Sequence, residues 1–197
     1  MLERQSAIAS ALAKGGRDGA DGRRRLKLGE QRGGSLIQLA AFASTLSQLE
    51  QAAAPLLGAA LPTEVGKVVV AGPRQLLRTG PEQFWILGPA ADDIATRLQG
   101  AIDPSIGVVT PLSHSRTRII LEGPTASDLL MQGIPLDLHV DVFREGQFAI
   151  TGLHHTPVLL LHNAQNRYEI FAMRTFALSV WEWLTDAALP WGYEVVA

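Results

Sequence analysis

The sequence predicts an α+β fold of two ferredoxin-like halves, antiparallel sheets backed by helices, with a flexible basic N-terminal arm. Two observations lead to this fold class. Segments with strand periodicity alternate with segments of helical periodicity, and hairpins intervene between them. The resulting order, β-α-β-β-β-α-β, occurs once in residues 34–110 and again in residues 111–197. The 197 residues are enough for a sizeable core, so we expect residues 34–197 to form one compact unit behind an arm of residues 1–33.

The arm is distinguished by its charge. The first 33 residues carry eight Lys or Arg and four Asp or Glu, whereas the rest of the chain carries nine and fifteen. Residues 15–25 are rich in glycine and charge and have no large apolar side chain, so alone they should stay flexible. We expect them to order on a partner's surface, although a simple tether is the alternative. Nucleic-acid binding is not favoured, because the arm has no aromatic residue for stacking and the body has no basic face.

The first half is predicted to contain, in order, strand 35–40, helix 45–57, strand 67–71, hairpin 75–78 and 83–87, a helix opened by residues 88–89, and strand 106–109. Thr45 and Gln48 have the spacing of a capping box at the start of the first helix. Pro89 suits the first position of the second helix, and Asp92 and Asp93 should lie in its first turn.

The second half is predicted to contain a strand at 116–121, a helix opened by 123–124, two strands within 148–161, a strand at 168–171, a helix at 176–184 and a last strand at 191–196. Thr175 is expected to cap the last helix. Residues 88–94 and 123–129 share the pattern Gly-Pro-x-Ala-x-Asp-apolar, which is typical of a strand–turn–helix junction. The repeat either reflects two related halves or is a chance similarity of two junctions.

No catalytic, cofactor-binding or metal-ligating residue is assigned on this chain. It has no cysteine, which excludes thiolate chemistry, and no phosphate loop or flavin-binding fingerprint occurs. His154 and His155 are adjacent, so on a strand they would point to opposite faces and could not share a metal. The run Ser113-His114-Ser115 does not suit a nucleophile and its base, and these hydroxyls are expected to satisfy backbone groups.

A partner is suggested by the low charge content of the chain. Charged residues make up 18%, against roughly 25% in average soluble proteins. Arg116 and Arg118 should project from one face of a strand, either as an ion-paired face or as a clamp on a carboxylate or a partner's acid. Trp181 and Trp183 lie too far apart around their helix to point the same way, so one should pack in the core and the other should face a partner.

Several segments resemble the gamma subunits of heterotetrameric sarcosine oxidases. The resemblance covers nearly the whole chain. Its most specific parts are Leu136-Asp137-Leu138-His139 and Ser179-x-Trp181-Glu182-Trp183-Leu184; further parts are Leu112-Ser113-His114-Ser115-Arg116 and Glu30-x-Arg32-Gly33-x-Ser35-Leu36-Ile37-Gln38. The resemblance implies the fold of aminomethyltransferases and folate-binding proteins. Independently of the fold, we expect partner contacts at Arg116, Arg118, His139, Trp181 and Trp183.

The resemblance implies a non-catalytic role in an oxidoreductase complex that demethylates sarcosine to glycine, with peroxide and either formaldehyde or methylene-tetrahydrofolate as products. FAD, FMN, NAD, tetrahydrofolate and zinc would belong to the alpha, beta and delta subunits, and none to this chain. The equivalent subunit of N-methylglutamate dehydrogenase is an alternative, as is a stand-alone folate-binding or aminomethyl-transfer protein. The lack of cysteine and of a membrane-length apolar run leads us to expect a cytoplasmic protein without a membrane partner.

Overall fold

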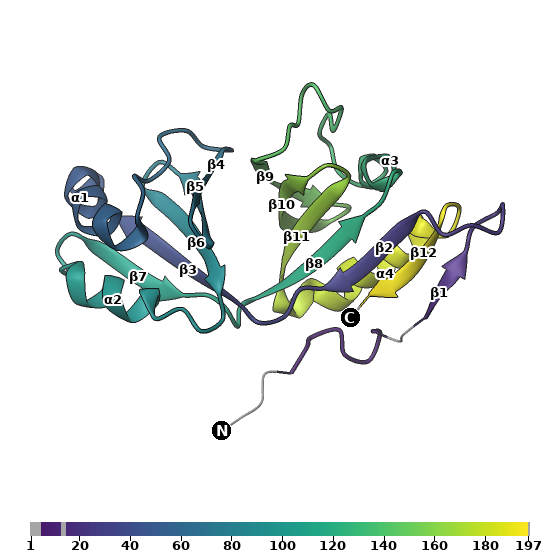
Figure 1. Ribbon diagram of the computed structural model, residues 1–197, viewed down its shortest axis with the longest axis horizontal. Helices are drawn as coiled ribbons and strands as arrows, with labels where there is room; N and C mark the ends of the chain where they lie inside the picture. Colours follow the sequence, from purple (N-terminus) through teal and green to yellow (C-terminus); the bar gives the residue numbers. More distant parts are fainter. Residues whose placement is uncertain (1–4, 13–14, 197) are drawn as a thin grey trace. The chain divides into compact units, whose positions relative to one another are not determined.

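A computed structural model of the protein describes residues 5–12 and 15–196, and Figure 1 traces its helices and strands. The chain divides into two units. One is continuous in sequence and comprises Gly33–His114; the other joins Met1–Arg32 to Ser115–Ala197. We call them the continuous unit and the split unit.

The continuous unit contains the elements predicted for the first half. In chain order they are β3 (Gly34–Ala41), α1 (Leu46–Leu57), β4 (Val68–Ala71), β5 (Arg74–Gly80), β6 (Gln83–Pro89), α2 (Ile94–Ala101) and β7 (Gly107–Pro111). The sheet order is β4-β5-β6-β3-β7, and all its neighbouring strands are antiparallel. The α+β prediction is confirmed here, with α1 and α2 on one side of the sheet (Figure 1).

Helix packing in this unit follows from the spacing of its apolar residues. Leu49, Ala53 and Leu57 recur every four residues along α1 and are buried. They form a core with Ile94 and Leu98 of α2 and with the apolar residues on the helix-facing side of the sheet. Burial of each such leucine contributes about 1.5–3 kcal/mol, so the helical stripe fixes which side of α1 faces the sheet.

The start of α1 is where the sequence predicts it, but the capping box is wrong. Thr45 occupies the N-cap position without a side-chain capping hydrogen bond. Its hydroxyl instead accepts the backbone N–H of Phe42 and donates to the carbonyl of Ile106. Thr45 therefore connects the beginning of the helix to Ile106, just before β7. This long-range hydrogen bond takes the place of a hydrogen bond within the helix cap.

The split unit contains the elements predicted for the second half. They are β8 (Arg116–Glu122), α3 (Ala126–Met131), β9 (Gln147–Leu153), β10 (Thr156–Ala164), β11 (Arg167–Met173), α4 (Ala177–Ala188) and β12 (Gly192–Val196). A 3-10 turn, η1 (Arg174–Phe176), precedes α4. Thr175 lies within this turn, so it does not cap α4 as expected.

Two further strands, β1 (Gly15–Asp18) and β2 (Leu26–Glu30), come from the N-terminal segment. The sheet order becomes β1-β12-β2-β8-β11-β10-β9. Without β1 and β2, the order is β12-β8-β11-β10-β9. If the five strands of each half are numbered along the chain, this is the order of the continuous unit read from β7 to β4. In the continuous unit the first strand, β3, pairs directly with the last, β7. In the split unit β2 separates them, antiparallel to β8 and parallel to β12.

The expectation of a flexible arm is therefore wrong for these residues. Leu26 and Leu28 are 1% and 0% exposed and point toward α3 and α4, whereas Lys27 points to the opposite face. Ile8 is also fully buried in the same core. Leu-Lys-Leu is a short alternating pattern typical of a strand, and pairing on both sides with β8 and β12 outweighs the ordering entropy of the glycine-rich chain before it.

The two Gly-Pro junctions differ in position and conformation. Residues 88–89 end β6, the fourth strand of its half, whereas residues 123–124 follow β8, the first strand of its half. Gly123 has φ of 142°, and a Cβ there would lie 2.0 Å from the carbonyl oxygen of Arg25. Gly88, in contrast, is not one of the described glycines that have a positive φ. The sequence repeat thus marks two strand–helix junctions at non-equivalent places and does not trace a duplication.

Candidate functional site

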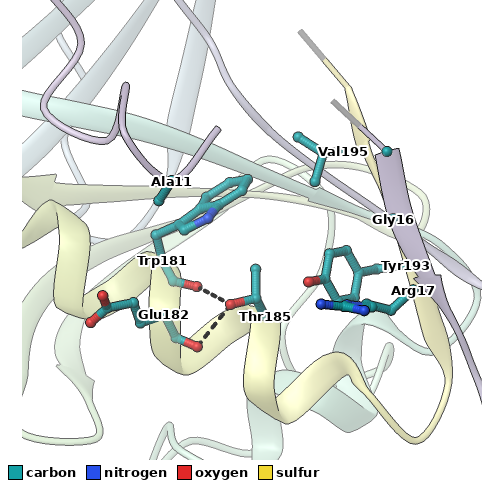
Figure 2. Close-up of a pocket in the computed structure, with 9 residues that line it drawn as sticks. Ala11, Gly16, Arg17, Trp181, Glu182, Thr185, Tyr193 and Val195 are labelled. Atoms are coloured by element: carbon teal, nitrogen blue, oxygen red, sulfur yellow. Dashed lines mark hydrogen bonds between the residues drawn. The ribbon is translucent and has the colours of Figure 1, made fainter. Parts of the chain in front are cut away.

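The split unit holds an open cavity of about 390 Å³ between β1, β12 and α4 (Figure 2). Its walls come from both ends of the sequence. Arg17 and Gly15 belong to β1, Tyr193 and Val195 to β12, and Trp181, Glu182 and Thr185 to α4. The volume lies within the range of roughly 300–1,000 Å³ that is usual for small-molecule sites.

Strand register explains why a hollow forms here. Gly15 pairs with Val195 and Arg17 pairs with Tyr193, so these four residues share one face of the ribbon. Gly15 contributes no side chain, and no atom lies within 4 Å of the place where its Cβ would stand. The ribbon face that carries Arg17, Tyr193 and Val195 is therefore unfilled at Gly15.

Three hydrogen-bond donors border this cavity. Figure 2 shows the Arg17 guanidinium beside the Tyr193 hydroxyl, both directed toward Thr185, and the Trp181 indole nitrogen on the ring edge nearest Thr185. Among residues 5–12 and 15–196, these three side chains make no hydrogen bond or ion pair. Thr185 differs, because its hydroxyl is bonded to the carbonyls of Trp181 and Glu182 at 3.1 and 2.9 Å. The cavity is thus rich in unused donors.

A second polar cluster lies on the other face of the same sheet and includes Arg118. Its Nε is 2.6 Å from Oε2 of Glu169, while Asn163 Nδ2 donates to Oε1 at 3.0 Å. Glu169 is 1% exposed, and the Arg118 guanidinium stacks 5.4 Å from the centroid of the Phe171 ring. Of the two readings open for Arg118, the ion-paired one describes this chain, because the carboxylate that it binds is its own.

Arg116 and His139, also expected to contact a partner, lie in different surroundings. Arg116 is two residues before Arg118 on β8, and burial lowers the pKa of its guanidinium from the ordinary value. His139 is exposed in the loop after α3. Its backbone N–H is bonded to Asp137 Oδ1 at 2.9 Å, and its Nδ1 accepts from the backbone of Asp141 at 3.3 Å. The Leu-Asp-Leu-His segment is therefore held by hydrogen bonds within its own loop.

The two tryptophans divide as the helix geometry predicts, one into the core and one nearer the surface. Trp181 is 2% exposed, so the expectation that it contacts a partner does not fit its position. Trp183 is half-buried, and its ring covers Gly133 so closely that a Cβ there would lie 2.5 Å from it. A glycine at this point of the chain is needed for that contact. Trp183 thus packs against the loop after α3 and remains partly exposed.

The adjacent histidines do not point to opposite faces. His154 and His155 form the turn between β9 and β10, where His154 has φ of 55°, and their ring centroids lie 4.0 Å apart. The expectation fails because the alternation of a strand does not continue through a tight turn. Within the described part of the chain, no group of three or more His, Asp or Glu side chains is arranged to hold a metal ion.

Ser113 accepts the backbone N–H of Leu36 through its hydroxyl at 2.9 Å, so the prediction that this hydroxyl satisfies the backbone is confirmed. Among residues 5–12 and 15–196, none of the helices has the length and apolar character of a bilayer span.

Sequence reasoning missed the cavity between β1, β12 and α4. Arg17 and Tyr193 stand at opposite ends of the chain and meet only because β1 pairs with β12. No local sequence motif predicts such a contact. The one available signal was the alternating Leu26-Lys27-Leu28, which indicates that the N-terminal segment contributes a strand.

Comparison with known proteins identifies several similar chains. The family model described as the sarcosine oxidase, gamma subunit family matches residues 40–189. Sarcosine oxidase subunit gamma from Corynebacterium sp. (strain P-1) is 33% identical over 149 residues, which cover 74% of this chain and 72% of that protein. The protein of the same description from Arthrobacter sp. is 29% identical over 191 residues, covering 96% of this chain and 91% of its own.

Solved structures show the same similarity. A chain of the heterotetrameric sarcosine oxidase from Corynebacterium sp. U-96, in complex with pyrrole 2-carboxylate, superposes with a TM-score of 0.82 at 28% identity, covering 95% of this chain and 96% of that chain. Aminomethyltransferase T of the glycine cleavage system from Bartonella henselae superposes with a TM-score of 0.64 at 17% identity, covering 88% of this chain and 48% of that chain. The second likeness concerns the fold alone and agrees with the aminomethyltransferase-like fold that was predicted.

Proposed function

The chain belongs to the sarcosine oxidase gamma subunit family, and from this premise we propose that it is the non-catalytic gamma-type subunit of a heterotetrameric sarcosine oxidase. The observation that carries the proposal is the superposition on a chain of such a tetramer across 95% of the sequence. Agreement over this share of the chain extends beyond either half alone.

The reaction of the proposed complex is the oxidative demethylation of sarcosine to glycine, with hydrogen peroxide and either formaldehyde or methylene-tetrahydrofolate as products. In this proposal FAD, FMN, NAD, tetrahydrofolate and zinc are bound by the alpha, beta and delta subunits, and the gamma-type chain stabilises the flavin-bearing alpha and beta subunits. The complex would act in sarcosine catabolism in the cytoplasm. The equivalent subunit of N-methylglutamate dehydrogenase remains the nearest alternative assignment.

Partner contact is supported by apolar side chains that stay exposed around the start of α4. Met173, Phe176 and Leu178 are 41%, 43% and 37% exposed, although their neighbours Ala177 and Val180 are buried. Large aromatic side chains on a surface are typical anchors of protein interfaces. We propose that this group, together with Arg116, Arg118, His139 and the exposed part of Trp183, contacts the partner subunits.

Co-expression with the candidate alpha, beta and delta chains, followed by size-exclusion chromatography, tests the assignment. We expect the chain to co-elute with them and the purified complex to form peroxide with sarcosine. A chain that elutes alone as a monomer in every combination would overturn the proposal. Comparing sarcosine with N-methylglutamate as substrates of the purified complex distinguishes a sarcosine oxidase from an N-methylglutamate dehydrogenase.

A matched pair of variants tests the proposed contact. Phe176→Glu should reduce co-elution because it places a charge in the apolar group at the start of α4. Val70→Glu changes a residue that is 70% exposed on β4 of the continuous unit and should leave co-elution unchanged. Both variants should keep the circular dichroism of the parent chain. Equal behaviour of the two variants would contradict a contact at α4.

A further inference from the structure

We propose that the cavity between β1, β12 and α4 binds the carboxylate group of a small organic acid, with Arg17 as its principal ligand. The proposal goes beyond the assembly role and does not depend on it. It rests on the donors that border the cavity, on the apolar wall beside them and on the space left at Gly15.

The donors select an anion with acceptor oxygens. The Arg17 guanidinium presents a planar fork of N–H groups that matches a carboxylate, and the Tyr193 hydroxyl lies beside it in Figure 2. The two residues are directly opposed on paired strands, so the β1–β12 ribbon holds them on one face. A guanidinium without a partner among the described residues supplies the positive charge.

Trp181 adds a third donor to the cavity wall. The residue is only 2% exposed, so its ring is held in place by the core. Its indole nitrogen faces the cavity in Figure 2, so an acceptor placed in the cavity would satisfy it.

The cavity should also prefer some anions to others. Val195 and the indole of Trp181 form an apolar wall next to the donors, which favours an organic acid with an apolar body over a mineral anion. Glu182 carries the opposite charge, but Figure 2 shows its carboxylate on the far side of Trp181 from Arg17. The anionic end of a ligand therefore belongs at Arg17, and an apolar body belongs between Val195 and Trp181.

Titration of the full chain with phenylacetate and with phenylacetamide tests this proposal. The two probes have the same shape, and only the first carries a carboxylate. The chain has four tryptophans, so the Trp181 indole N–H signal can be followed by two-dimensional NMR after assignment with Trp181→Phe. We expect saturable shifts of this signal with phenylacetate, and binding at least about tenfold weaker with the amide, the loss of one charge-assisted contact.

Variants separate the cavity from a general charge effect. Arg17→Gln should weaken phenylacetate binding about tenfold or more and leave phenylacetamide binding unchanged, which also shows that the cavity remains intact. Arg23→Gln removes the same charge from an exposed position outside the cavity and should change either affinity by less than about twofold. Tyr193→Phe should weaken phenylacetate alone, by roughly threefold to tenfold.

Three outcomes overturn the proposal. They are equal binding of acid and amide, an unchanged affinity in Arg17→Gln, and no saturation of the Trp181 signal up to about 20 mM probe. Repeating the titration on the assembled complex identifies the source of the carboxylate. A probe that still binds shows a site for a free acid, whereas a probe excluded only from the complex shows that an acidic side chain of a partner fills the cavity.

Discussion

The Nε of Arg118 lies 2.6 Å from the Oε2 of Glu169, and Glu169 is 1% exposed in the seven-stranded sheet. Asn163 donates to the other carboxylate oxygen, so the buried acid has a hydrogen bond on each side. The pair joins β8 to β11 through their side chains. Arg118 therefore has a structural task within the chain, whatever it contacts outside it.

Breaking this pair from one side should be costly. Arg118→Met leaves the Glu169 carboxylate buried without its cation, and we expect a loss of about 3–5 kcal/mol in the free energy of unfolding measured in urea. The double variant Arg118→Met with Glu169→Leu should be less destabilised than Arg118→Met alone, because no buried charge then remains. Equal stability of Arg118→Met and the parent chain would show that the pair is not formed in solution.

The strand β2 can be tested against the flexible arm that its composition suggested. Leu28 is fully buried, so Leu28→Ala should lower the free energy of unfolding by about 2–5 kcal/mol. Lys27→Ala, one residue away on the opposite face, should change it by less than about 0.5 kcal/mol. Thermal melts of the two variants make the comparison, and coincident melts would speak for an arm that is not part of the fold.

Backbone conformation at Gly123 makes a separate prediction. Its φ of 142° and the 2.0 Å approach of a Cβ to the Arg25 carbonyl oxygen leave no room for any other residue. Gly123→Ala should destabilise the chain by more than about 2 kcal/mol. Gly100 in α2 has nothing within 4 Å of its Cβ position, so Gly100→Ala should instead stabilise the chain by roughly 0.5–1 kcal/mol. Shifts of equal sign in chemical denaturation would contradict the structure.

The ion pair between Arg74 and Asp92 makes stability depend on pH. The two N–H groups of Arg74 donate to the Asp92 carboxylate at 2.6 and 2.7 Å, and these bonds lower the carboxyl pKa below its ordinary 3.8. Because the folded pKa is the lower one, the stabilisation is present above the ordinary pKa and is lost as pH falls through the lowered value.

Asp92→Asn should therefore cost about 2 kcal/mol near neutral pH, and its difference from the parent chain should shrink below about pH 4. Asp93 is a matched control, because its side chain is 74% exposed and lies 4.0 Å from Arg97. Asp93→Asn should show no comparable loss of stability near neutral pH. Denaturation midpoints measured from pH 7 down to the acid limit provide the test, and a constant Asp92→Asn deficit would argue against the pair.

Periodicity predicted the fold because the body of each half follows local rules. The stripe Leu49, Ala53 and Leu57 defines α1 without any knowledge of its partners, and the two predicted orders of strands and helices are both present. The N-terminal segment escaped prediction because β2 is short and its stability comes from pairing with β8 and β12, which are distant in sequence. The glycine and charged residues that precede β2 instead favoured a flexible arm.

The candidate site was less predictable for the same reason. Thr45 and His154 were assigned from spacing alone, and both were redirected by contacts outside their own segment, the first by Ile106 and the second by a turn. The helix geometry separated Trp181 from Trp183 but could not tell which one was buried. Arg17 and Tyr193 meet through a strand pair whose partners are nearly a chain length apart, and no single-segment pattern contains that information.

The position of β2 in the sheet also determines when this part of the protein can fold during synthesis. Leu26–Glu30 leaves the ribosome well before Gly192–Val196, which forms one of its two neighbouring strands. The continuous unit has all its strands within Gly33–His114 and can fold while synthesis continues. β2 must wait with one edge unpaired until Gly192–Val196 has emerged, so the nascent chain is exposed to wrong strand pairing at β2.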